Sequence, residues 1–217
     1  MERVTVYVDG LNFYYGLISK MKSDSEWKKF YWLDIVKFFD HFVQRNQTLQ
    51  KVYYFTTPPA NSPEKSNRQT LLFEANQLIN GNKLEVVKGK YYDKKVFCTH
   101  CRQYTTVPEE KRTDVNISVQ MMRDCAQNKT DVLILVTADS DLVPPLEVIS
   151  DDYPNKKIKL FFPPTKHSYD LKSFIQTNGG QFLRLSNHKV RFRNSIMPNV
   201  VTAGTKTCTI PPEWQVT

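Results

Sequence analysis

Four aspartates occupy places where an α/β fold would gather them at one edge of its sheet. Asp9 directly follows the apolar run 4–8, and Asp139 and Asp141 follow the apolar run 132–136. Such folds bind ligands at the carboxyl ends of their strands. Carboxylates gathered there repel one another unless a divalent cation lies between them. Mg²⁺ and Mn²⁺ are the natural cations for oxygen ligands, so the pattern predicts a metal-dependent acidic site.

The fourth acid, Asp114, reaches the same edge by a different route. It opens the amphipathic segment 115–126, and the dipole of a helix favours an acid in its first turn. An aspartate after a strand is often only a loop residue or a helix cap. Four acids in register favour a site in which metal ions bind a phosphate, lower the pKa of a bound water and stabilise the leaving oxygen.

Several neighbours of these acids are candidates for a supporting role. Asn12 and the hydroxyls of Thr137 and Ser140 are expected to bind a metal-bound water or a phosphate oxygen. Lys111 and Arg112 are expected to offset charge on a phosphate.

Strands and helices alternate along most of the chain. Apolar runs predict strands at 4–8, 51–55, 84–88, 132–136, 157–162 and 181–185, with helical patterns at 11–21, 33–43, 69–78, 115–126, 142–150 and 168–176. This alternation predicts an α/β fold with a doubly wound, mostly parallel sheet. The pattern leaves the strand order open.

Composition narrows the class of protein. The 217 residues carry a formal net charge of +8, which favours an anionic partner. No apolar run has the length of a membrane span and the N-terminus does not resemble a signal peptide, so no membrane association is expected. Four cysteines without a secretory signal predict reduced thiols and a cytoplasmic location.

Residues 89–111 show no helical pattern and are interpreted as an inserted hairpin containing Cys98 and Cys101. Two cysteines at this spacing are half of a zinc site. Either a second chain supplies the remaining ligands, which would make the protein a homo-oligomer, or the pair is a reduced part of a surface hairpin.

The hairpin also mixes cations with aromatic rings. Lysines neutralise phosphates while rings stack on unpaired bases, so the hairpin is either a nucleic-acid contact or a solvated hairpin. Its candidate contacts are Lys90, Tyr91, Lys94, Lys95 and Arg102. The aromatic residues between 14 and 32 favour core packing over base stacking. Residues 186–217 are interpreted as a basic, polar tail, extended or partly disordered.

Three motifs, taken in order, resemble the NYN domain, a branch of the PIN-like nuclease superfamily, with the LabA-like group as the closest match. They are VYVDGLN at 6–12, KRTDVN at 111–116 and LVTADSDLVP at 135–144. The resemblance runs from about residue 4 to residue 185. Ala138 stands where the family often has glycine, a change that preserves the chemistry.

This resemblance implies a Rossmann-like, PIN-type fold and a Mg²⁺- or Mn²⁺-dependent nuclease that usually acts on RNA. The residues carried over from the family's motifs are its metal-binding acids, Asp9, Asp114, Asp139 and Asp141, together with Asn12 and Thr137. The group often has a similar cysteine pair upstream of the second acid. The domain organisation expected is therefore a nuclease domain at 1–185, with the hairpin inserted at 89–111, and a tail at 186–217.

The function expected is an endoribonuclease that cleaves single-stranded or structured RNA through metal-assisted attack of water. DNA stays open as a substrate, because nothing in the sequence reads a 2′-hydroxyl. The alternative is a non-catalytic RNA-binding or scaffold protein on the same fold. A phosphatase of the haloacid-dehalogenase type is disfavoured, because Asp9 is followed by Gly10 and Leu11 and not by the Asp-x-Asp arrangement.

Overall fold

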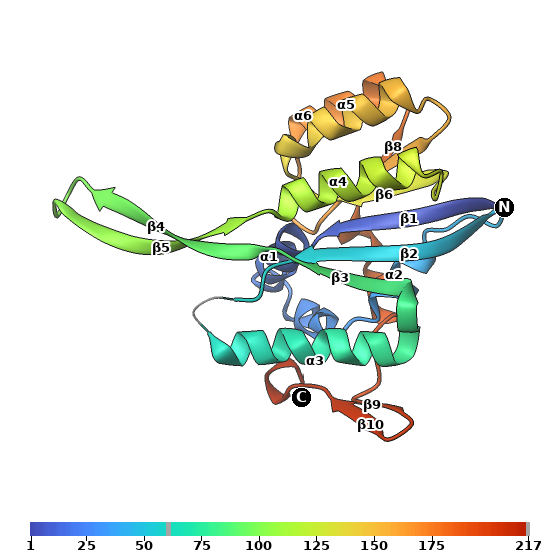
Figure 1. Ribbon diagram of the computed structural model, residues 1–217. Helices are drawn as coiled ribbons and strands as arrows, with labels where there is room; N and C mark the ends of the chain where they lie inside the picture. Colours follow the sequence, from blue (N-terminus) through green and yellow to red (C-terminus); the bar gives the residue numbers. More distant parts are fainter. Residues whose placement is uncertain (60–61, 216–217) are drawn as a thin grey trace.

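Six parallel strands form the central sheet of the computed structural model, which describes residues 1–59 and 62–215 (Figure 1). The strands lie in the order β3-β2-β1-β6-β7-β8. Their bounds are β1 (Glu2–Asp9), β2 (Gln47–Thr56), β3 (Leu84–Lys88), β6 (Val132–Val136), β7 (Lys157–Phe162) and β8 (Gln181–Arg184). This is a doubly wound order, and the direction of winding reverses between β1 and β6. The predicted parallel α/β architecture is confirmed.

Helices cover both faces of the sheet (Figure 1). One face carries α1 (Gly10–Met21), the 3-10 helix η1 (Ser25–Tyr31), α2 (Ile35–Asp40) and α3 (Pro63–Asn80). The other face carries α4 (Thr113–Ala126), α5 (Val143–Asp152) and α6 (Tyr169–Thr177). Two short 3-10 helices connect other elements: η2 (Gly81–Lys83) comes directly before strand β3, and η3 (Ser140–Leu142) comes directly before helix α5.

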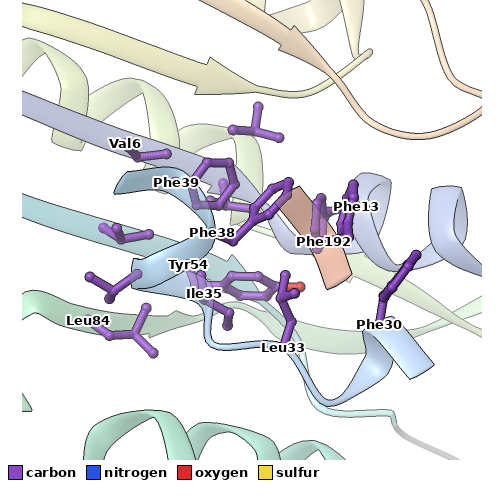
Figure 2. Packing of buried hydrophobic residues seen from close by; sticks show 14 of the residues in the cluster. Val6, Phe13, Phe30, Leu33, Ile35, Phe38, Phe39, Tyr54, Leu84 and Phe192 are labelled. Atoms are coloured by element: carbon purple, nitrogen blue, oxygen red, sulfur yellow. The ribbon is translucent and has the colours of Figure 1, made fainter. Parts of the chain in front are cut away.

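The strand side chains alternate between two hydrophobic cores, as the period of a strand requires. In β1, Val4, Val6 and Val8 face the α1–α3 layer, while Tyr7 faces the α4–α6 layer. Figure 2 shows the first core, where Phe13, Phe38 and Phe39 lie against the sheet. Continuous apolar strands of this kind are typical of parallel sheets buried on both sides.

The inserted hairpin is confirmed as an antiparallel ribbon that projects away from the sheet (Figure 1). Strands β4 (Lys90–Cys98) and β5 (Gln103–Lys111) pair along their full length. The turn between them contains Cys101 and ends at Arg102, whose φ of 54° lies in the left-handed region.

Residues 186–215 do not form the extended or partly disordered tail that their composition predicts. They contain η4 (Leu185–His188), α7 (Lys189–Arg193), β9 (Val200–Ala203), β10 (Lys206–Thr209) and η5 (Pro212–Trp214). Phe192 is fully buried, with its ring centroid 4.1 Å from that of Phe38. The indole N–H of Trp32 donates to the Pro198 carbonyl at 2.8 Å. Sparse apolar residues at these few positions give the segment enough contacts to fold onto the domain.

The aromatic residues before β2 take part in the core, as their density predicts. Trp27, Phe30 and Trp32 are each at most 1% exposed, which excludes them as base-stacking platforms, whereas Tyr15 is 54% exposed. Within the described ranges, every helix is too short or too polar to cross a membrane.

Candidate functional site

Asp9 lies at the end of β1, at the switch point of the sheet, and its carboxylate accepts three hydrogen bonds. One carboxylate oxygen of Asp9 accepts from the backbone N–H of Asn12 at 3.0 Å, which caps α1. The other accepts from the Asn12 side-chain amide at 2.5 Å and from the Thr137 hydroxyl at 2.8 Å. Asp9 is only 3% exposed. Burial raises the pKa of its carboxyl although these bonds oppose the shift, and the charge of Asp139 raises it further.

The loop after β6 brings two more acids to Asp9 through the buried hydroxyl of Thr137. This hydroxyl donates to Asp9 and accepts from the backbone N–H of Asp139 at 3.0 Å. Asp139 in turn caps η3, because its carboxylate accepts from the N–H of Asp141 at 3.0 Å. Asp139 is half-buried, and Asp141 and Ser140 are exposed. One hydroxyl thus ties the ends of the two central strands together.

Asp114 stands in the first turn of α4, as predicted, and is half-buried. Burial raises the pKa of its carboxyl to about 6, and the charges of four neighbouring acids contribute to the rise: Asp9, Asp139, Glu110 and Asp141. A carboxyl feels these charges only when they are close in a poorly screened environment. The four predicted aspartates therefore form one electrostatic cluster.

The cluster contains a fifth acid, Glu110, which the sequence analysis did not include. Its carboxylate accepts from the Thr57 hydroxyl at 3.1 Å, the Thr113 N–H at 3.3 Å and the Thr113 hydroxyl. A Cβ on Gly89 would lie 2.8 Å from the same carboxylate oxygen, so the root of the hairpin closes around Glu110. The only sequence signal for Glu110 is the alternation of side chains along a strand, which places Glu109 and Glu110 on opposite faces of the hairpin.

The donor set fits a hard divalent cation in its chemistry. It offers carboxylate oxygens, and the charged neighbours that raise the pKa of Asp114 are all acids. As the side chains are placed, however, no three or more Asp, Glu, His or Cys residues within 1–59 and 62–215 form a group that could hold a metal ion. The acids are thus clustered, but they are not arranged as a ready-made coordination shell.

The predicted nucleic-acid contacts fall on two faces of the hairpin. Pairing puts Lys90, Lys94 and Lys111 on the face of Glu109, and Glu109 forms ion pairs with Lys94 at 2.8 Å and Lys111 at 3.0 Å. The opposite face carries Glu110. Lys90, Lys94 and Lys111 are therefore turned away from the acids.

Arg112 and Arg102 lie at opposite ends of the hairpin. Arg112 donates to the Tyr92 hydroxyl at 2.8 Å and lies over the Tyr92 ring, 5.7 Å from its centroid. Arg102 lies in the exposed turn at the tip of the hairpin. The guanidinium of Arg112 is thus held by Tyr92 at the root of the hairpin, next to the helix that carries Asp114, and Arg102 lies at the far end.

Tyr91 and Lys95 share the hairpin face of Glu110. Burial raises the pKa of Tyr91, and the charges of Tyr15 and Glu110 add to the shift. This face continues from the acid cluster towards Phe97 and Tyr104, whose ring centroids lie 5.1 Å apart.

The cysteine pair lies at the tip of the hairpin, where Cys98 is half-buried and Cys101 exposed. Hydrogen bonds from the backbone and thiol of Cys101 and from the backbone of His100 lower the pKa of Cys98. Cys125 and Cys208 are buried in the body of the domain. Two thiols are thus available at the tip.

Fold and site together define an α/β domain with an acidic cluster at its switch point, and comparison with known proteins names the family. The model of the NYN domain family matches residues 3–176. The chain therefore belongs to the NYN domain family, whose members are generally nucleases of the PIN-like type.

Two individual proteins are also similar to this chain. The 6-hydroxy-3-succinoylpyridine 3-monooxygenase HspA of Pseudomonas putida is 24% identical over 179 residues, which cover 68% of this chain and 55% of that protein. The chain thus spans about half the length of this curated relative. The crystal structure of VPA0982, a protein of unknown function from Vibrio parahaemolyticus, has a TM-score of 0.56 and 20% identity. The matched region covers 85% of this chain and 93% of the VPA0982 chain, and this likeness supports the fold.

Proposed function

We propose that this protein is a metal-dependent endoribonuclease whose site is the acid cluster at the switch point. The observation that carries the proposal is the gathering of acids around Asp114: burial, together with the charges of Asp9, Asp139 and Asp141, raises the pKa of its carboxyl to about 6. Negative charge concentrated in this way is costly unless a cation offsets it. Membership of the NYN family supports a nucleic acid as the source of the phosphodiester.

The four aspartates would hold Mg²⁺ or Mn²⁺, together with oxygens of the substrate phosphate. A divalent ion at this place supplies a more acidic water and stabilises charge on the phosphate. Thr137 and Asn12 do not need to touch the substrate, because both donate to Asp9 and fix the direction of its carboxylate. Asp139 is fixed in the same way by its contact with Thr137.

Water attack at this site would leave a 5′-phosphate and a 3′-hydroxyl. The chain presents acids at the ends of β1 and β6, and an attack by the 2′-hydroxyl would call for a different acid–base pair. End-labelled single-stranded RNA and DNA, incubated with Mn²⁺, Mg²⁺ or EDTA, test this proposal. We expect metal-dependent products with 5′-phosphates from RNA. Products ending in a 2′,3′-cyclic phosphate would contradict water attack.

The binding alternative makes a different prediction in the same assay. A non-catalytic RNA-binding or scaffold protein would bind RNA in both the parent and the Asp139→Asn variant and would cut with neither. DNA cleavage by the parent would keep the nuclease proposal and change its substrate.

Zinc at the hairpin tip is a separate part of the proposal. Cys98 and Cys101 would supply two of the four ligands of a structural zinc, and the pair resembles a feature of the LabA-like group, to which the three sequence motifs assign the protein. The other ligands would come from a second copy of the chain. Metal analysis combined with sedimentation tests this: one zinc per dimer supports it, and a zinc-free monomer contradicts it.

The cytoplasm is the proposed location. All four cysteines are free, and reduced thiols persist in a reducing compartment.

A further inference from the structure

A groove separate from the acid cluster lies against the β7–β8 edge of the sheet. It consists of two adjoining hollows of about 790 and 560 Å³, which share four lining residues, Gln44, Lys159, Gly180 and Gln181. Sites that bind small ligands have volumes of about 300–1,000 Å³. Each hollow therefore has room for one part of an extended ligand.

The charge lining this groove is positive. The described residues of its lining include no aspartate or glutamate, and its basic members are His41, Lys156, Lys157, Lys159, His188 and Arg191. Two of the lysines are met by carboxylates outside the lining, Lys157 by Glu2 and Lys156 by Asp131 at 3.8 Å. Within the part of the chain that the structure describes, no ion pair is formed by Lys159, His188 or Arg191. Positive charge is therefore left without a counter-charge in the larger hollow.

Lys159 is a nearly buried ammonium group without an acid of its own. It is 9% exposed, and its neighbours across the sheet are Ile134 on β6 and Gln181 on β8. Burial lowers the pKa of Lys159, and the charge of Glu2 only partly offsets this effect. Glu2 is itself paired with Lys157. A ligand that brings an anion to Lys159 would therefore stabilise its charged form.

Arg191 is held in the groove by an aromatic ring and not by an acid. Its guanidinium carbon lies 4.2 Å from the centroid of the Phe42 ring. The same ring lies 5.0 Å from the ring of Phe161 and 5.2 Å from that of His188. Stacking on the face of a ring uses none of the N–H groups of a guanidinium. Arg191 is thus positioned in advance, with donors that suit the paired oxygens of a phosphate.

We propose that this groove binds the phosphate backbone of a nucleic-acid strand through Lys159 and Arg191, as a contact separate from the acid cluster. A groove lined by cations follows the backbone of a single strand without reading its sequence. The hairpin lysines are less suited to this contact, since Lys94 and Lys111 already pair with Glu109. The inference rests on the proposed function for the source of the phosphates.

Fluorescence anisotropy of the full chain with labelled single-stranded RNA, in EDTA to prevent cleavage, tests the groove. Arg191→Gln and Lys159→Met each remove one cation and keep most of the length of the side chain. We expect each variant to bind RNA severalfold more weakly and to reduce the slope of log affinity against log salt by about 0.7, the value for one phosphate contact on a single strand. Parental affinity and slope in both variants would overturn the proposal.

A further variant avoids any change to a buried side chain. Gln181 is exposed in β8 and lines both hollows, so Gln181→Glu should repel the strand and weaken RNA binding without unfolding the domain. The matched controls are Lys206→Gln for the loss of a cation and Gln77→Glu for the gain of an acid, both at exposed positions outside the groove. The controls should bind RNA as the parent does. Equal losses in the controls and the groove variants would mean that only net charge matters, which would overturn the proposal.

Two competitors separate a strand from other anions. Adenosine 5′-monophosphate and polyglutamate, each at the same concentration of anionic groups as the RNA, should leave the RNA bound. Displacement by the mononucleotide would indicate a site for a free nucleotide, and displacement by polyglutamate would indicate a site for an acidic peptide; either result would overturn the proposal.

The groove and the nuclease site fail separately. Weaker RNA binding in the groove variants, without RNA cleavage by the parent in Mn²⁺, would keep the groove and remove the nuclease. Cleavage by the parent, with parental RNA binding in Arg191→Gln and Gln181→Glu, would keep the nuclease and remove the groove.

Discussion

A single buried hydroxyl, that of Thr137, connects the two strand ends that carry the acids. It donates to Asp9 at 2.8 Å and accepts from the Asp139 backbone at 3.0 Å. Thr137→Val keeps the shape but leaves the Asp9 oxygen and the Asp139 N–H short of one partner each. We expect a loss of about 1–3 kcal/mol in the free energy of unfolding and at least a tenfold loss of cleavage rate, measured by urea denaturation and end-labelled RNA.

The control for this variant is Thr130→Val. Thr130, which precedes β6, is also fully buried, and its hydroxyl donates at 3.0 Å to the carbonyl of Val132, the first residue of that strand. Thr130→Val should lower the free energy of unfolding, but each folded molecule of this variant should cleave RNA at the parental rate. If both valine variants lost cleavage equally, Thr137 would have no special role in placing the acids.

Asp114 gives the acid cluster a pH dependence. Its pKa is raised from 3.8 to about 6, so the folded protein binds this proton more tightly than the unfolded chain does. The stability contributed by the protonated carboxyl is full below pH 4 and is lost as the pH rises through about 6. Asp114→Asn keeps a neutral side chain at all pH values.

The variant should therefore gain stability relative to the parent between pH 4 and pH 7.5. Because Asp114 is half-exposed, solvent screens part of the effect of its pKa shift on stability. The expected gain in the free energy of unfolding is therefore on the order of 1 kcal/mol. Urea unfolding in EDTA at both pH values measures it. A difference between variant and parent that does not change with pH would contradict the shifted pKa.

Residue types and spacing alone were enough to predict where the four aspartates lie, because each stands at a strand end or a helix start. They could not predict Glu110. Its inclusion depends on the face to which each hairpin residue points, and neither the register of β4 with β5 nor the space around Gly89 is written in a local pattern. The same reason explains why Lys94 and Lys111, close in sequence to aromatic residues, turn out to pair with Glu109.

At the level of elements, the hairpin has one face that continues from the acids and one that does not. Phe97 and Tyr104 lie on the face of Glu110, 47% and 71% exposed, whereas Val96 and Val107 lie on the opposite face, each 39% exposed. If a single strand leaves the site along the first face, its bases stack on these rings. The double variant Phe97→Ser and Tyr104→Ser should then weaken RNA binding about tenfold or more.

Fluorescence anisotropy with labelled single-stranded RNA measures this effect, in an Asp139→Asn background that prevents cleavage. The control is the pair Val96→Ser and Val107→Ser, which removes two exposed apolar side chains from the other face. All four side chains are exposed, so neither double variant should unfold the domain. Equal losses in the two double variants would rule out a face-specific path for RNA.

Helices and strands could be predicted wherever their apolar residues recur with the spacing typical of a helix or a strand. α3 shows the limit: the apolar pattern begins near residue 69, but the helix starts at Pro63, because Ser62 caps it and its first turns are polar. The C-terminal segment is the larger miss. Its composition is that of a tail, and only distant partners on η1 and α2 reveal that Phe192 completes a core.

At the scale of the whole molecule, the segment after β8 stabilises the domain from outside the family match at 3–176. The Phe192 ring lies 5.1 Å from both Trp27 and Phe30 and is fully buried. Phe192→Ala should lower the free energy of unfolding by about 3–5 kcal/mol. Val190→Ala, at a site 61% exposed, should change it by less than about 0.5 kcal/mol. Urea denaturation measures both values. If the two variants lost similarly small amounts of unfolding free energy, the C-terminal segment would not be part of the cooperative fold.

The central claim is that the acid cluster cleaves RNA with a divalent ion, and one comparison tests it most directly. Cleavage of end-labelled single-stranded RNA in Mn²⁺ is measured for the parent, for Asp139→Asn and for Asp152→Asn, an exposed acid at the end of α5. We predict cutting by the parent and by Asp152→Asn, its abolition by EDTA, and a loss of at least a hundredfold in Asp139→Asn. Cutting that survives in Asp139→Asn at the parental rate would contradict the account.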